Sequence, residues 1–323
     1  MLMSPLGRSP LTVSAVGLGC NNFGRVGAAS EEQRGTSAVV AAALEAGVTF
    51  FDTADSYGKE FGLSESLLGA ALRGHRDEVV IATKFGHASI PSPILDAGNK
   101  GSPAYIRRAV EGSLTRLGTD YIDLYQQHTP DPSTPIAETL GALADLVTEG
   151  KVRAIGHSNF DAGQIANAHS EATRLGSPEF VSAQDEYNLV ARGVEADVLP
   201  AVRDADLSFL PYFPLANGLL TGKFTRTERP ADTRISRQRP HVADDAPWDS
   251  LEAYARFCAE RGISMLEATF GWLLAQPALA SVIAGATTAE QVRQNAAAGS
   301  RWQPTGEDLA LIDSWFPPSS NEK

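Results

Sequence analysis

The chain has 323 residues, of which 43% are hydrophobic and 20% are charged, a composition typical of one large globular domain or two ordinary ones. Its net charge of −12 would repel nucleic acid and anionic membranes, and no run of about 18 apolar residues could cross a bilayer. Two cysteines give no disulfide framework, and the first residues lack the apolar segment of a signal peptide. These features predict a soluble cytoplasmic protein without nucleic-acid or membrane partners.

Short apolar runs alternate with helical patterns along almost the whole chain. Eight runs are mostly apolar at consecutive positions, as strands buried on both faces should be, at 16–20, 48–52, 79–84, 122–128, 152–158, 180–186, 207–213 and 281–285. Helical patterns occupy 31–46, 64–73, 103–117, 135–149, 161–175, 193–205, 249–276 and 288–298. Eight strand-then-helix units favour a closed (β/α)₈ TIM barrel over an open doubly wound sheet.

Helix boundaries carry their own signals. Glycines stand where helices should end, at Gly47, Gly118, Gly150 and Gly176. Capping residues or first-turn prolines mark helix starts at Ser102-Pro103, Thr134-Pro135 and Asp161. No change in composition marks a domain boundary, so residues 1–323 are expected to form one domain. Long loops at 87–101 and 216–246 follow strands and should lie at the carboxyl-terminal mouth of the barrel, and the end at 317–323 should be frayed.

Polar side chains stand where three consecutive predicted strands end. Asp52 and Tyr57 belong to the second strand and the loop after it, Lys84 ends the third, and His128 ends the fourth. Because the carboxyl ends of barrel strands meet at one mouth, these side chains should come together there. Taken singly, each is ambiguous, since a buried Asp–Lys pair is often structural and a tyrosine on a loop usually has no special role.

Together the four residues suit the reduction of a carbonyl group. Delivery of hydride to a carbonyl leaves an alkoxide, which must be protonated or hydrogen-bonded as its charge develops. The hydroxyl of Tyr57 can do this if the nearby cation of Lys84 favours its ionised form. Asp52 would hold that cation in place, and His128 would orient the carbonyl.

The segment 51–58, with the sequence FDTADSYG, resembles the signature of the aldo-keto reductase family. Further matches follow in order along nearly the whole chain, and they include TKFG at 83–86, DLYQQH at 123–128, GHSNF at 156–160 and PLANGLLTGK at 214–223. Within the family, the chain is similar to the bacterial branch that includes the potassium-channel β-subunit-like proteins. The resemblance implies reduction of an aldehyde or ketone with NADP(H), taking hydride from nicotinamide C4 and a proton from Tyr57.

The resemblance also implies a role for each site residue. Tyr57 would be the general acid, tuned by Lys84 and Asp52, with His128 orienting the carbonyl. The nicotinamide would be held by the side chains of Ser158, Asn159, Gln184 and Tyr212. The rest of the cofactor would be held by Pro214, Leu215, Gly218, Lys223, Arg234, Gly285, Thr287, Gln291, Gln294 and Asn295. No metal is implied.

NADPH is expected over NADH because Arg234 and Lys223 can supply positive charge to a 2′-phosphate. Helical spacing puts Gln291, Gln294 and Asn295 on one face, whereas Arg293 falls off that face and is expected to point to solvent. Gln294 stands where relatives often carry Glu, and an amide can still bind adenine.

Some positions depart from the family pattern or leave alternatives open. His157 replaces an aliphatic residue, and it is either a neutral histidine satisfied by the backbone or part of the cofactor pocket. Thr129 replaces a common Trp at the pocket rim, and Phe23, Phe85 and Tyr57 suggest an aromatic substrate site. The physiological substrate and the oligomeric state stay open.

Three other classes of protein fit the sequence less well. The string Gly17-Leu18-Gly19 lacks the third glycine of a dinucleotide-binding fingerprint. Six scattered histidines without a His-x-His pair disfavour a metal-dependent hydrolase. A cofactor-sensing partner of another protein would not need all four residues of the predicted catalytic set.

Overall fold

The computed structural model describes residues 1–94, 97–231 and 233–318, and within them eight parallel strands form one sheet in the order β10-β3-β4-β5-β6-β7-β8-β9. The strands are β3 (Val16–Gly19), β4 (Phe50–Asp52), β5 (Val80–Phe85), β6 (Ile122–Gln127), β7 (Val152–Ser158), β8 (Phe180–Glu186), β9 (Ser208–Tyr212) and β10 (Val282–Gly285). Backbone hydrogen bonds join Phe209 of β9 to Ala278 and Ala280, just before β10, so the two edges of the sheet meet. The predicted (β/α)₈ barrel is confirmed.

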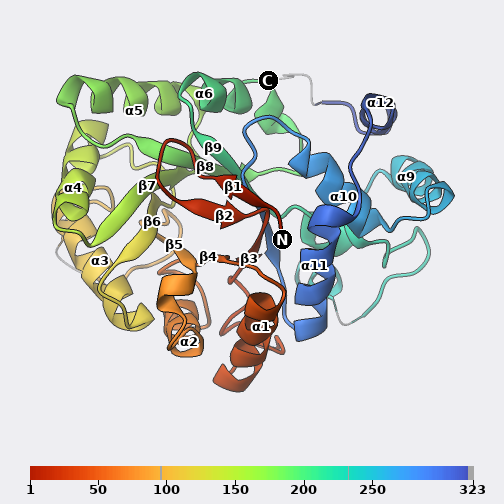
Figure 1. Cartoon of the computed structure of the whole chain (residues 1–323), viewed down its shortest axis with the longest axis horizontal. Helices are drawn as coiled ribbons and strands as arrows, with labels where there is room; N and C mark the ends of the chain where they lie inside the picture. Colours follow the sequence, from red (N-terminus) through yellow and green to blue (C-terminus); the bar gives the residue numbers. More distant parts are fainter. Residues whose placement is uncertain (95–96, 232, 319–323) are drawn as a thin grey trace.

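Helices surround the strands, as Figure 1 shows. They are α1 (Gln33–Glu45), α2 (Leu63–Ala71), α3 (Pro103–Leu117), α4 (Ile136–Thr148), α5 (Ala162–Leu175), α6 (Val198–Asp204), α9 (Trp248–Glu260), α10 (Met265–Leu274), α11 (Ala289–Arg301) and α12 (Gly306–Trp315). Helix ends follow the expected chemistry at most positions: Gly118 and Gly176 have φ of 64° and 60°, and the side chains of Ser102 and Asp161 accept capping hydrogen bonds. No helix among the described residues is long and apolar enough to span a membrane.

Several predicted elements are corrected by the structure. The predicted helix 249–276 is two helices, because Gly262 turns the chain with φ of 65° and Ser264 starts α10 with a capping box to Glu267. The predicted helix 193–205 begins as a separate 3₁₀ turn, η2 (Gly193–Glu195). Thr134 does not cap α4, since its hydroxyl donates to Asp131 instead.

Elements that the sequence did not predict close the barrel and shape its mouth. A hairpin of β1 (Met3–Pro5) and β2 (Thr12–Ser14) brings Leu6 and Val13 against Phe50 and Leu124, in a core cluster inside the sheet. The predicted loop 216–246 contains η3 (Ala216–Thr221), α7 (Arg234–Gln238) and α8 (His241–Asp244). Residues 319–323 of the expected frayed end, and 95–96 and 232 of the two long loops, lie outside the described residues.

Strand register places the polar side chains at one end of the barrel. Lys84 of β5 is level with Gln126 of β6, and Gln184 of β8 is level with Ser158 of β7. Alternation along β5 separates Lys84 from its neighbours Thr83 and Phe85, which face the other side of the sheet. The carboxyl ends of β4 to β8 therefore supply one layer of polar groups above an apolar interior.

Two helical glycines offer a matched test of helix packing around the barrel. A Cβ at Gly69 of α2 would lie 2.2 Å from the backbone oxygen of Leu117, whereas one at Gly141 of α4 would meet nothing within 4 Å. We expect Gly69→Ala to lower the free energy of unfolding by about 1–3 kcal/mol through overpacking. Gly141→Ala should raise it by about 0.5–1 kcal/mol because alanine favours the helix. Urea unfolding of both variants checks this, and equal shifts would contradict it.

Candidate active site

A buried ion pair lies at the centre of the polar layer. Lys84 is fully buried, and its Nζ lies 2.7 Å from Asp52 Oδ2 and donates to the backbone oxygen of Thr53 at 2.9 Å. The other carboxylate oxygen, Asp52 Oδ1, accepts hydrogen bonds from Gln184 at 3.0 Å and Gln126 at 3.3 Å. Both charges are thus paired and hydrogen-bonded, which is the condition under which ions persist in a protein interior.

Tyr57 lies above this pair, on the loop that follows β4. The Nζ of Lys84 is 5.2 Å from the centre of the Tyr57 ring. Gly58, with φ of 108°, makes the turn that sets the ring, and a Cβ there would press on Leu63. Burial raises the pKa of Tyr57, while the charge of Lys84 acts in the opposite direction. The phenol is therefore protonated at neutral pH, and the lysine favours its ionised form once a proton leaves.

His128 packs against the tyrosine from the end of β6. Its ring centre is 5.7 Å from that of Tyr57 and 4.5 Å from that of His87, and both contacts are edge-on. Burial lowers the pKa of His128 well below its usual value, and the charges of Lys84 and His87 lower it further. His128 is therefore neutral, with one nitrogen that donates and one that accepts a hydrogen bond.

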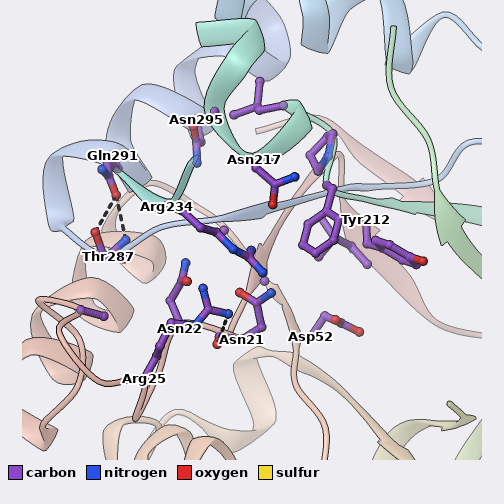
Figure 2. A pocket seen from close by; sticks show the side chains of 18 of the residues that line it. Asn21, Asn22, Arg25, Asp52, Tyr212, Asn217, Arg234, Thr287, Gln291 and Asn295 are labelled. Carbon is purple, nitrogen blue, oxygen red and sulfur yellow. Dashed lines mark hydrogen bonds between the residues drawn. The ribbon is translucent and has the colours of Figure 1, made fainter. Parts of the chain in front are cut away.

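These residues lie at the inner end of a cavity of about 1360 Å³, more than a drug-sized ligand requires. Asp52, Tyr57 and His128 line it, and Lys84 lies beneath them. Every predicted cofactor residue lines the same cavity: Ser158, Asn159, Gln184, Tyr212, Pro214, Leu215, Gly218, Lys223, Arg234, Gly285, Thr287, Gln291, Gln294 and Asn295. Figure 2 shows part of this lining, from Gln291 and Asn295 at one end to Tyr212 and Asp52 at the other. The structure thus brings the predicted residues together, and their individual roles stay predictions.

The four residues predicted to hold a nicotinamide form one hydrogen-bonded group. Ser158 donates to the backbone oxygen of Gln184 at 2.7 Å, and Asn159 donates to that of His128 at 3.0 Å. The hydroxyl of Tyr212 donates to Asn159 Oδ1 at 2.9 Å. Asn159 has φ of 61°, a left-handed conformation that asparagine tolerates better than most residues. The group fixes the side chains beside the tyrosine before any ligand binds.

The opposite end of the cavity lies at the start of α11. Thr287 donates to Gln291 Oε1 from its backbone nitrogen at 2.8 Å and from its hydroxyl at 3.1 Å. Gln294 donates to Glu290 at 2.9 Å, which brings a carboxylate next to this end. Arg293 forms an ion pair with Glu45 and does not line the cavity, as its helical position predicted.

Some residues that line the cavity were not predicted from the sequence. Asn21, Asn22 and Arg25 come from the loop after β3, and Arg239 follows α7. The rule that strand ends meet at the mouth could have indicated the first three, because they directly follow a predicted strand. Gln126, which supports Asp52, could be found only from the cross-strand register.

The structure corrects three expectations about aromatic and histidine side chains. His157 is fully buried, stacks on Phe160 at 4.5 Å, and has no hydrogen-bond partner on either ring nitrogen among the described residues. Burial lowers its pKa to about 3, so it is neutral as expected, but no backbone group in the described part of the chain hydrogen-bonds it, and it does not line the cavity. Phe23 and Phe85 are fully buried and do not line the cavity either, so of the three expected aromatics only Tyr57 does.

The residues present fit a dinucleotide. Arg234 Nε is buried without a hydrogen-bond partner among the described residues, and Arg234 forms no ion pair there. Burial, followed by the charges of Arg25 and Arg239, lowers the pKa of Arg234 to about 10. A phosphate would relieve this repulsion, since arginine binds phosphate through two parallel hydrogen bonds. The segment 215–223, which includes η3, also contributes residues to the lining of this cavity.

Comparisons with known proteins give a consistent result. A family model described as "Aldo/keto reductase family" matches residues 15–316. An "Uncharacterized oxidoreductase YrpG" of Bacillus subtilis (strain 168) is 37% identical over 98% of this chain and 96% of its own length. An "L-glyceraldehyde 3-phosphate reductase" of Escherichia coli (strain K12) is 33% identical over 95% of this chain and 90% of its own. An "NADH-specific methylglyoxal reductase" of the same strain is 37% identical over 91% of this chain and 92% of its own length.

The buried ion pair predicts a specific pattern of stability. Lys84→Met leaves the Asp52 carboxylate buried without its cation, so we expect a loss of about 3–5 kcal/mol in the free energy of unfolding. Adding Asp52→Asn should recover part of that loss, because the uncompensated charge is gone. The exposed pair Arg174–Glu171 is the control, and Arg174→Met should cost less than about 1 kcal/mol. Denaturant unfolding measures all the variants, and strictly additive losses at Lys84 and Asp52 would show that the pair is not coupled.

Proposed function

The chain belongs to the aldo/keto reductase family, and on that basis we propose that it reduces an aldehyde or ketone to an alcohol with NADPH. One observation carries the proposal: Tyr57, Lys84, Asp52 and His128 meet at the inner end of a cavity that is large enough for a dinucleotide and lined by residues suited to it. The cytoplasm stays the proposed location, since Cys20 and Cys258 are free and buried.

A bound NADPH would supply the hydride. Ser158, Asn159 and Gln184 would hold its carboxamide, and the ring of Tyr212 would cover one face of the nicotinamide. Lys223 and Arg234 would hold phosphate groups, and Thr287, Gln291, Gln294 and Asn295 would hold the adenosine end. Four further residues would contact the cofactor through their backbone, where the chain can approach it closely: Pro214, Leu215, Gly218 and Gly285.

The chain's own residues would handle the oxygen of the substrate. Tyr57 and the neutral His128 face the same part of the cavity, so both can hydrogen-bond a carbonyl oxygen. Tyr57 gives up its proton as negative charge develops on that oxygen. Lys84 then stabilises the phenolate, and Asp52, held by two glutamines, keeps the lysine ammonium fixed beneath it.

The choice of NADPH rests on cations along the cavity wall. Arg234 lacks an ion-pair partner among the described residues, and Lys223 lines the same cavity. Two features act in the other direction: Glu290 is hydrogen-bonded to Gln294 at the adenosine end, and one relative is named as NADH-specific. The two cations outnumber the single carboxylate, so we expect NADPH to be favoured.

The general acid can be tested by Tyr57→Phe. The phenyl ring should still pack and the cofactor should still bind, but turnover of a panel of aldehydes and dicarbonyls, methylglyoxal included, should fall by about two to four orders of magnitude. Tyr121→Phe is the matched control, because the hydroxyl of Tyr121 bonds to Asp77 and does not line the cavity. The readout is cofactor absorbance at saturating substrate. Near-normal turnover by Tyr57→Phe would overturn the assigned role, and no turnover of any carbonyl by the unaltered protein would overturn the function.

Cofactor preference can be tested by measuring kcat/KM with NADPH and NADH for the unaltered protein and for Arg234→Ala. We expect NADPH to be favoured about ten- to hundredfold, the worth of one charge-assisted contact. Arg234→Ala should remove most of that preference. An equal or higher value with NADH in the unaltered protein would show that the choice of NADPH is wrong.

A further inference from the structure

Three arginine side chains from separate segments line the cavity. Arg25 comes from the loop after β3, Arg234 begins α7, and Arg239 follows it. Figure 2 shows Arg25 and Arg234 entering the cavity from separate segments, with Asn21 and Asn22 beside them. In a chain of net charge −12, this concentration of positive charge is local and opposite to the rest of the molecule.

The three cations repel one another without neutralisation by an ion pair. Among the described residues none of them forms an ion pair, and Arg25 donates only to the backbone oxygen of Asn21, at 3.0 Å. Arg234 and Arg239 stack near Phe213, at 4.8 and 5.2 Å from its centre. Glu186 interacts electrostatically with both of these without reaching ion-pair distance. Clustered and half-buried cations of this kind are stabilised by a bound anion.

The position of the cluster distinguishes it from the adenosine end. Arg234 and Arg239 lie beside Phe213, whose ring centre is 5.1 Å from that of Tyr212. The charge of Arg25 interacts with those of Arg239 and Tyr57. Thr287, Gln291 and Asn295 line the other end of the cavity, as Figure 2 shows for their side chains. With Lys223 and Arg234 assigned to cofactor phosphates, Arg25 and Arg239 are left near the place where a carbonyl would react.

We propose that Arg25, together with Arg239, binds an anionic group on the substrate. The preferred substrates are then short aldehydes or ketones that carry a phosphate or carboxylate a few bonds from the carbonyl. This inference rests on the proposed function. It adds a binding subsite that none of the assigned catalytic or cofactor residues supplies.

The test compares matched carbonyl substrates that differ in charge. Glyceraldehyde 3-phosphate and glyceraldehyde form one pair, and succinic semialdehyde and butanal form the other. We expect kcat/KM to favour the charged member of at least one pair by tenfold or more, and Arg25→Gln to reduce that ratio roughly 10- to 100-fold. Arg25→Lys should fall between the two, because lysine keeps the charge but lacks the planar fork. Arg73→Gln, an exposed change of the same net charge outside the cavity, should leave the ratio unchanged.

Cofactor binding distinguishes whether Arg25 binds an anionic group of the substrate or a phosphate of the cofactor. Fluorescence titration of NADPH and NADH should give dissociation constants for Arg25→Gln within about threefold of those of the unaltered protein. Loss of one charge-assisted contact to the cofactor would raise the dissociation constant by about tenfold or more. A loss of cofactor affinity with equal losses on charged and neutral substrates would show that Arg25 serves a cofactor phosphate, and would overturn the proposal.

A binding arm makes the result independent of turnover. Calorimetric titration of glycerol 3-phosphate and glycerol into the cofactor-saturated protein should show binding of the phosphate ester alone, weakened at least tenfold by Arg25→Gln. If no carbonyl is reduced but this binding persists, the proposed function fails and the anion subsite stands. If carbonyls are reduced with no charge preference in either pair and no binding depends on Arg25, the subsite is overturned and the function stands.

Discussion

The site depends on holding the Lys84 ammonium away from water in a fixed position beneath Tyr57. Lys84 is fully buried, and a buried ammonium persists only where a counter-ion and hydrogen bonds replace the water that it has lost. Asp52 supplies the counter-ion, and its second oxygen is held by Gln126 and Gln184. Four strands, β4, β5, β6 and β8, therefore contribute to one ion pair, and the closed parallel sheet is what brings them level. A displacement of any of these strands would leave a charge or an amide unpaired in the interior.

The ion pair affects the protonation of the two side chains above it, Tyr57 and His128. The lysine favours ionisation of Tyr57 while burial opposes it, so the phenol keeps its proton until charge develops on a ligand. His128 is kept neutral by the same burial and by the same lysine, and it is therefore available to orient an oxygen without competing as a cation. The lining of the cavity also differs along its length: amides and hydroxyls lie at the start of α11, whereas Arg234 and Arg239 lie beside Phe213.

The sequence predicted the barrel and the catalytic group because both follow from local patterns. Apolar runs place the strands, and Asp52, Lys84 and His128 stand at their ends. Features that depend on distant segments were not accessible: Gln126 meets Asp52 only through the register of the closed sheet, and Arg25 meets Arg239 only through the path of the loop after β9. The break between α9 and α10 is different, because Gly262 and the Ser264 capping box were readable and the helical pattern on both sides masked them. Among the described residues the ring nitrogens of His157 have no hydrogen-bond partner, and no local sequence pattern indicates this.

The central claim is direct hydride delivery to a carbonyl held at Tyr57, on the one cofactor face that Tyr212 leaves open. It is tested by supplying the cofactor deuterated at C4 in either of its two configurations and analysing the alcohol product by mass spectrometry. The account predicts that one configuration places a single deuterium on the carbinol carbon and the other places none. Transfer from both configurations, or cofactor oxidation without a labelled alcohol from either, would contradict it.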